Sequence, residues 1–171
     1  AVLQGRLSVT EVLMVEAAAL ATASAALGID WMHHVFKPLA LSIAIVFAAR
    51  RASVSGGVTR FDGLLIAGLV ASLAGDVLLM GPATLFVPGL VCFLLAHLAY
   101  IALFRIGVGL FPRRSALAAT LLIGAGMYAF LWQGGLPPAL RIPVGVYVVV
   151  IACMAAQAIG RAAVLRTADP S

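Results

Sequence analysis

The chain has 171 residues, of which 64% are hydrophobic and only 10% are charged, whereas roughly 25% are charged in an ordinary soluble domain. Its mean hydropathy is +1.16, and the apolar stretches run along its whole length, which excludes both a water-soluble globule and a protein with a single membrane anchor. The formal net charge is +5, but the arginines stand at the ends of apolar runs without interleaved aromatics. We therefore expect no nucleic-acid partner.

Apolar runs bounded by charges or by Pro and Gly predict six transmembrane helices. They fall at about 9–29, 35–50, 62–81, 85–104, 115–132 and 141–160. The first eight residues are expected to form an N-terminal tail that is partly a remnant of processing or expression, since the chain begins with Ala. A short connection is expected at 30–34 and a cytoplasmic C-terminal tail at 161–171. The predicted fold class is all-α, a polytopic helical bundle of about six spans over 9–160.

The distribution of basic residues predicts the orientation of this bundle. With helices at these positions, nine arginines lie on one side of the membrane, and only Lys37 and Arg141 lie on the other. Because cytoplasmic loops carry the excess of Lys and Arg, both termini are expected in the cytoplasm. Trp31 and Trp132 then fall near the outer boundary, where aromatic belts occur. The preference for Arg over Lys and the richness in Ala and Gly favour a bacterial genome rich in G and C. The expected location is the bacterial inner (plasma) membrane.

The third predicted helix carries an aspartate where the membrane tolerates few charges. Gly68, Ser72 and Asp76 recur at intervals of four and therefore lie on one face. One interpretation is a packing seam of small residues, in which Asp76 pairs with Lys37. The other is a functional site, because a carboxyl group removed from water can deliver a proton, or can stay ionised beside a cation and activate water.

The fourth predicted helix carries a polar and aromatic stripe. Phe93, His97, Tyr100 and Phe104 recur at spacings of four, three and four, which places them on one face. His97 can be a packed, hydrogen-bonded residue or a functional one, and Glu16 of the first predicted helix is expected at a similar depth.

A second His or Cys at the spacing of a metal pair is absent, so no metal site is expected. Phosphate loops, GxSxG and HExxH are absent as well.

Three segments together carry a family resemblance. They are VFKPLA at 35–40, GLVASLAGDVLLM at 68–80 and FLLAHLAYI at 93–101. Their order and spacing resemble the pattern KP, SxxGD and FxxAHxxY of the YhhN-type lysoplasmalogenase family, and a weaker similarity continues through Tyr147 and Met154. Members of that family are typically eight-helix membrane enzymes, and two of the eight, one of which bears a second aspartate, are expected to be missing from this chain.

The resemblance implies hydrolysis of the vinyl-ether bond of lysoplasmalogens to a fatty aldehyde and glycerophosphoethanolamine or glycerophosphocholine by acid/base catalysis. It implies catalytic roles for Asp76, His97 and Tyr100, and substrate binding by Lys37 and Ser72. Glu16 is a candidate for the second carboxylate. The expected partners are a lysophospholipid substrate and membrane lipids, and no cofactor is expected because hydrolysis needs only water. The alternative is a non-catalytic lipid-binding or carrier protein that uses a polar pocket at Lys37 and Asp76.

Overall fold

A computed structural model describes residues 30–54 and 57–168, with side chains for residues 38–54 and 57–167. All elements in these ranges are helices. They are α2 (Asp30–Val54), α3 (Arg60–Leu79), the short 3-10 helix η1 (Ala83–Leu85), α4 (Phe86–Phe104), α5 (Arg114–Gln133) and α6 (Pro138–Ala168). The predicted all-α class is therefore confirmed. The predicted helix at 9–29 lies outside the described residues.

The helices at 62–81, 85–104 and 115–132 agree with the structure to within two residues at each end. The connection predicted at 30–34 is wrong, because α2 begins at Asp30 and passes through Pro38 without ending. The Ser42 hydroxyl donates to the Pro38 carbonyl at 2.8 Å one turn later. At its start, α3 has a capping box, in which the Thr59 hydroxyl accepts from the Asp62 amide and the Asp62 carboxylate accepts from the Thr59 amide.

Helix α6 is longer than the predicted 141–160. It begins at Pro138, a position where the missing N–H of proline costs nothing. It continues to Ala168 and includes two arginines. A charged residue at the membrane boundary does not break a helix when its side chain can donate hydrogen bonds to nearby acceptors. Arg161 finds them in the carbonyls of Phe104 and Ile106.

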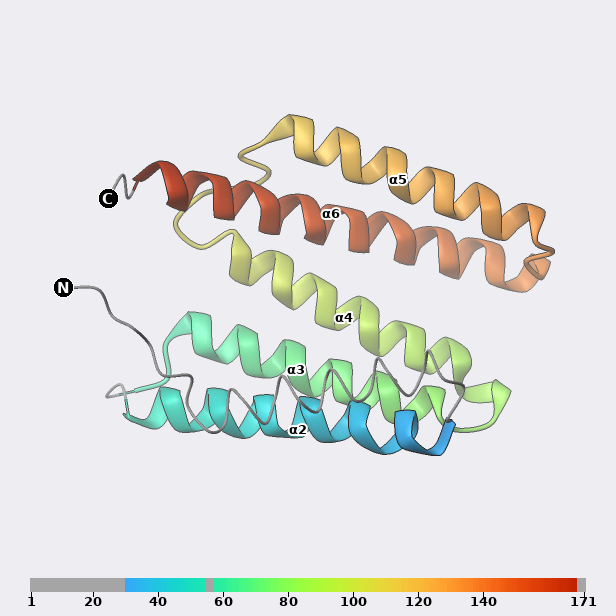
Figure 1. Cartoon of the computed structure of the whole chain (residues 1–171), viewed down its shortest axis with the longest axis horizontal. Helices are drawn as coiled ribbons and strands as arrows, with labels where there is room; N and C mark the ends of the chain where they lie inside the picture. The colour runs from blue at the N-terminus through green and yellow to red at the C-terminus, as the bar shows by residue number, and fades with distance from the viewer. Residues whose placement is uncertain (1–29, 55–56, 169–171) are drawn as a thin grey trace.

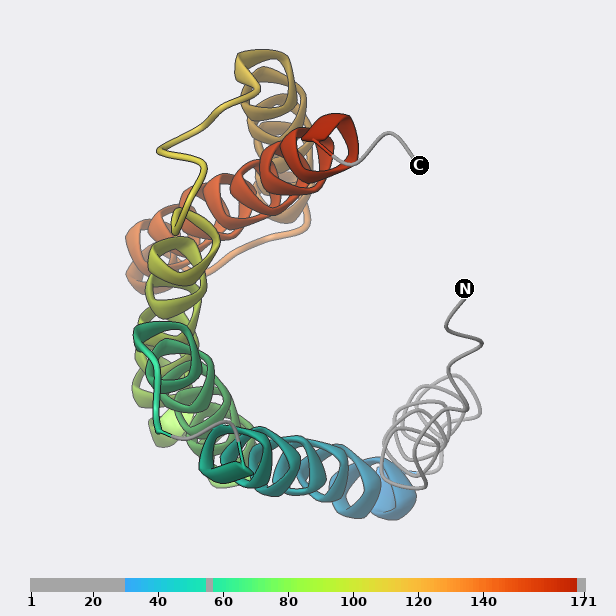
Figure 2. The same ribbon diagram turned by 90° about the vertical axis from the view of Figure 1, so that its left-hand side faces the viewer.

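The helices form one curved row whose order differs from the order in the chain (Figures 1 and 2). In space the order is α2, α3, α4, α6, α5, and each helix packs on the next. Helix α6 therefore returns to lie between α4 and α5. This placement brings side chains of α6 against the same helix, α4, that packs on α3.

The distribution of buried residues is that of a protein surrounded by lipid. The buried apolar side chains are mostly alanines, accompanied by four buried polar residues, Ser72, Asp76, His97 and Gln157. Large apolar side chains point outward instead, with Leu122, Ile123, Phe130 and Ile142 all at least 70% exposed. Small residues at helix contacts and large apolar residues outside are typical of membrane bundles.

Within the described ranges, four helical segments are long and apolar enough to cross a membrane. They are Arg60–Leu79, Ala83–Phe104, Arg114–Gln133 and Pro138–Thr167. Helix α2 is not among them, so the predicted count of about six spans is not confirmed.

Gln157 of α6 holds the loop that joins α4 to α5. Its side chain is fully buried. The Oε1 atom accepts from the Phe111 amide at 2.7 Å, and Nε2 donates to the Gly109 carbonyl at 2.8 Å. Phe111 has a φ of 46°, which is uncommon for a residue with a side chain. The amide of Gln157 thus fixes a strained loop from inside the bundle.

Candidate functional site

The two stripes predicted from the sequence pack against each other where α3 meets α4. A Cβ atom on Gly68 would lie 2.4 Å from Cε1 of Tyr100, and one on Gly75 would lie 2.8 Å from the Phe93 ring. Only glycine allows the two helices to approach this closely. The Ser72 and Tyr100 hydroxyl oxygens lie 3.4 Å apart, one turn further along the same seam. The close helix approach expected from the small residues is confirmed.

Asp76 lies beside this seam and is only 2% exposed. Both carboxylate oxygens are shielded from the surroundings. Its backbone carbonyl accepts from the amide of Met80, which caps α3, so the side chain stands in the last turn of a regular helix. A carboxyl group held in an apolar interior can act as an acid or a base only through groups close to it. Asp76 shares a stripe of α3 with Gly68 and Ser72, which pack against Tyr100 of α4.

His97 of α4 is 9% exposed, and its orientation is fixed by its own helix. The ring atom Nδ1 lies 2.5 Å from the Phe93 carbonyl oxygen. Since a carbonyl can only accept, Nδ1 carries the proton of this hydrogen bond. In the neutral ring, Nε2 is then the atom that can accept a proton or bind water.

Tyr147 of α6 completes the cluster, although the sequence predicts no role for this residue. Its ring packs edge-on against His97 with centroids 5.4 Å apart. On the other side, His97 contacts Tyr100 edge-on at 6.5 Å, and Tyr100 stacks on Phe104. The weak family similarity at Tyr147 was the one signal that could have identified it.

The structure therefore brings together Ser72, Asp76, His97 and Tyr100, four of the six predicted site residues, and adds Tyr147. Lys37 lies in α2, but its side chain is outside the described part of the chain. Glu16 also falls outside the described residues. The proposed contacts of these two residues stay predictions.

The cluster has the parts needed for proton transfer inside a membrane. It contains one carboxyl group, one imidazole with a defined donor nitrogen, and three hydroxyl groups, contributed by three helices. Each of these groups can hold a water molecule or the oxygen of a substrate. Buried ionisable groups in a membrane interior are costly, and a functional site is the first hypothesis for them.

Fold and site together define a helical membrane protein with a polar site enclosed between transmembrane helices. Within this class, the chain belongs to the YhhN family, whose pattern matches residues 32–170. The match includes α2 to α6 almost completely, and with them every residue of the cluster.

Three curated relatives carry the name lysoplasmalogenase. The human lysoplasmalogenase TMEM86B is 36% identical over 102 residues, which cover 60% of this chain and 42% of that protein. The lysoplasmalogenases of Mycobacterium bovis and Mycobacterium tuberculosis are each 36% identical over 124 residues, covering 69% of this chain and 47% of theirs. The chain thus spans less than half the length of these relatives. No solved structure matches it.

Proposed function

We propose that the chain is an integral-membrane hydrolase that cleaves the vinyl-ether bond of lysoplasmalogens at the Asp76 cluster. The observation that carries the proposal is the buried carboxyl group of Asp76, one turn along α3 from Ser72, whose hydroxyl oxygen lies 3.4 Å from that of Tyr100. The chain belongs to a family in which relatives are named lysoplasmalogenases. The products are a fatty aldehyde and glycerophosphoethanolamine or glycerophosphocholine.

The chemistry requires an acid and a base in a site that excludes bulk water. Protonation of the alkenyl carbon that does not bear oxygen gives an oxocarbenium cation. Water then adds to the neighbouring carbon and loses a proton, and the resulting hemiacetal collapses to aldehyde and alcohol. One water is consumed, and the proton returns to the site. One group donates the proton, and a carboxylate stabilises the cation. Glycosidases with paired carboxylates divide the two roles in the same way.

In this proposal Asp76 is one member of the acid/base pair. The second carboxylate is Glu16 or an aspartate on a helix outside this chain. His97 presents Nε2, and Tyr100 and Tyr147 present hydroxyls, so these groups orient water and the ether oxygen. Ser72 positions the Tyr100 hydroxyl, from which its own oxygen is 3.4 Å away. Lys37 binds the lipid phosphate, and both termini face the cytoplasm of a bacterial inner membrane.

The decisive experiment follows fatty aldehyde release from a vinyl-ether lysolipid by the purified chain in detergent. The variant is Asp76→Asn, which keeps the shape of the side chain and removes its acid/base function. The matched control is Asp62→Asn, which removes a carboxylate at the exposed start of α3 and leaves the cluster intact. We expect release by the parent and the control and at least a hundredfold loss in Asp76→Asn, since a positioned acid or base contributes about 10²–10⁴-fold.

Equal release by Asp76→Asn and the parent would refute the assignment of Asp76. An absence of aldehyde from the parent chain would refute Glu16 as the second carboxylate and the proposal that this chain is by itself a hydrolase. Saturable binding of the lysolipid without turnover would instead favour a lipid carrier, which the names of the relatives do not favour.

A further inference from the structure

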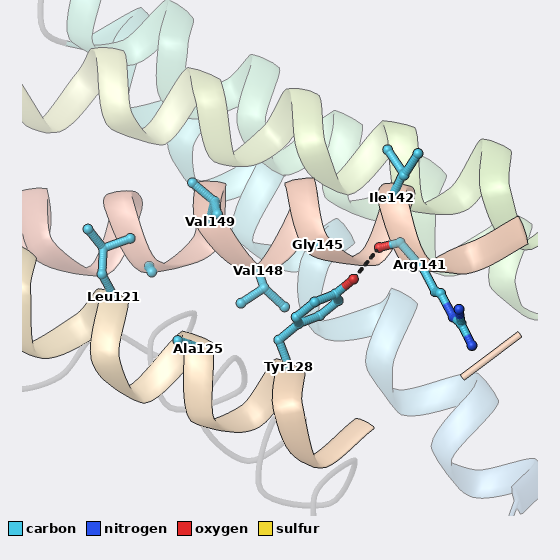
Figure 3. A pocket seen from close by; sticks show the side chains of 10 residues that line it. Leu121, Ala125, Tyr128, Arg141, Ile142, Gly145, Val148 and Val149 are labelled. Carbon is cyan, nitrogen blue, oxygen red and sulfur yellow. Dashed lines mark hydrogen bonds between the residues drawn. The ribbon is translucent and has the colours of Figure 1, made fainter. Parts of the chain in front are cut away.

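A second feature lies on the side of α6 away from the Asp76 cluster. Between α5 and α6 runs a groove with a volume of about 490 Å³. Figure 3 shows it lined by Leu121 and Ala125 of α5 and by Gly145, Val148 and Val149 of α6. Val149 is 52% exposed, so the groove opens to the surroundings of the bundle. Its walls are almost entirely aliphatic and offer nothing to a polar ligand along most of their length.

One end of the groove differs sharply from the rest. Arg141 and Tyr128 line it there, and the Tyr128 hydroxyl donates to the Arg141 carbonyl at 3.0 Å (Figure 3). The Arg141 guanidinium carbon lies 4.2 Å from the centroid of the Trp132 ring, a cation–π contact that holds the side chain in place. Tyr128 in turn packs edge-on against Trp132. The Arg141 guanidinium, held in place by Trp132, therefore lies at one end of the apolar groove.

The dimensions of the groove match those of one lipid chain. Its lining on α6 runs from Arg141 to Ala152, which is about 16 Å at a rise of about 1.5 Å per residue. The hydrocarbon of one leaflet is about 15 Å deep, half of the roughly 30 Å core. Trp132 is of the residue type that marks the membrane–water interface, where lipid phosphates begin. Arg141 stands at that level because it contacts this ring.

We propose that this groove binds an anionic phospholipid of the leaflet at the Arg141 end, with one acyl chain along α5 and α6 and the phosphate on Arg141. A guanidinium is suited to this role because it offers several donors in a planar fork that matches phosphate oxygens. Nε of Arg141 donates only a long bond of 3.4 Å to the Leu136 carbonyl. Within the described chain its Nη groups have no protein acceptor, so they can bind the phosphate.

This site is separate from the Asp76 cluster. Tyr147 points from α6 to His97 of α4, whereas Gly145 and Val148 face α5. A lipid in the groove would therefore contact neither Asp76 nor His97. The proposal is independent of the hydrolase activity and can stand if that activity fails.

The test uses the quenching of Trp132 fluorescence by brominated lipids. A Trp31→Phe variant of the full chain leaves Trp132 as its only tryptophan, since the sequence contains two. This variant is reconstituted into two kinds of phosphatidylcholine vesicle. One kind contains phosphatidic acid with brominated chains, and the other contains phosphatidylcholine with brominated chains. We expect phosphatidic acid to bind about fivefold more strongly, because one basic residue near the membrane surface contributes on that order. Arg141→Gln is expected to abolish the preference, while Arg141→Lys and Arg166→Gln retain it.

A second pair of variants tests the place of the acyl chain. Ala125→Leu puts a side chain into the groove, whereas Gly126→Leu adds one where a new Cβ meets no atom within 4 Å. Quenching by brominated phosphatidic acid should fall in the first variant and not in the second. An unchanged lipid preference in Arg141→Gln, or equal quenching in the two leucine variants, would overturn the proposal. If added inorganic phosphate removes the preference for phosphatidic acid, Arg141 binds a free anion, and this result would also overturn the proposal.

Discussion

Replacing Gly68 by alanine places a methyl group where the Tyr100 ring now lies. The new Cβ would be 2.4 Å from Cε1 and 2.9 Å from Cδ1 and Cζ of that ring. Carbon atoms in contact normally stay at least about 3.5 Å apart, so the overlap is roughly 1 Å. Tyr100 cannot rotate away freely because its ring stacks on Phe104 and its hydroxyl lies near Ser72. The helices α3 and α4 must separate instead.

The expected cost follows from two opposing effects. Overpacking a well-packed contact costs about 1–3 kcal/mol, and replacing glycine by alanine inside a helix recovers up to about 1 kcal/mol. We therefore expect Gly68→Ala to lower the free energy of unfolding by about 1–2 kcal/mol. Gly63→Ala is the matched control, because it lies in the same helix and its new Cβ meets no atom within 4 Å. That variant is expected to be at least as stable as the parent.

The assay is reversible unfolding of the purified chain in mixed micelles, followed by circular dichroism. A double-mutant cycle with Tyr100→Ala isolates the clash, since the small side chain leaves room for the new methyl group. In that background the cost of Gly68→Ala should vanish. The reasoning is refuted if Gly68→Ala matches Gly63→Ala, or if its cost is the same with and without the Tyr100 ring.

Three further predictions concern other positions. Gln157→Leu should cost about 1–3 kcal/mol, because it removes the partners of two part-buried backbone groups of the α4–α5 loop. It should also speed hydrogen exchange at the Phe111 amide, and unchanged exchange would contradict the prediction. Tyr147→Phe should lower the rate of aldehyde release at least tenfold, whereas Tyr128→Phe, in the α5–α6 groove, should leave that rate unchanged. If the two variants release aldehyde at the same rate, Tyr147 does not belong to the proposed site. Thr59→Ala should lower the free energy of unfolding by about 1 kcal/mol through loss of the α3 cap, and an unaltered unfolding curve would argue against the capping box.

Local features were the ones that could be predicted. The ends of α3, α4 and α5 follow from charged, Pro and Gly residues that stand beside apolar runs. The stripe of Gly68, Ser72 and Asp76 was visible for a similar reason, because residues four apart on a helix share a face whatever the helix packs against. The start of α2 was misplaced because polar residues from Asp30 onward predict a loop, although such residues are accepted within a helix.

Tertiary structure alone decided how the helices meet. The return of α6 to a place between α4 and α5 puts Tyr147 against His97 and Gln157 under the α4–α5 loop. It also forms the groove with Arg141 at its mouth. Periodicity reports which face of a helix is polar or small, but not which helix will cover that face, because that choice depends on packing over the whole bundle. The sequence by itself thus determined a membrane protein with a polar stripe on two helices, and the packing of a third helix turned that stripe into an enclosed cluster.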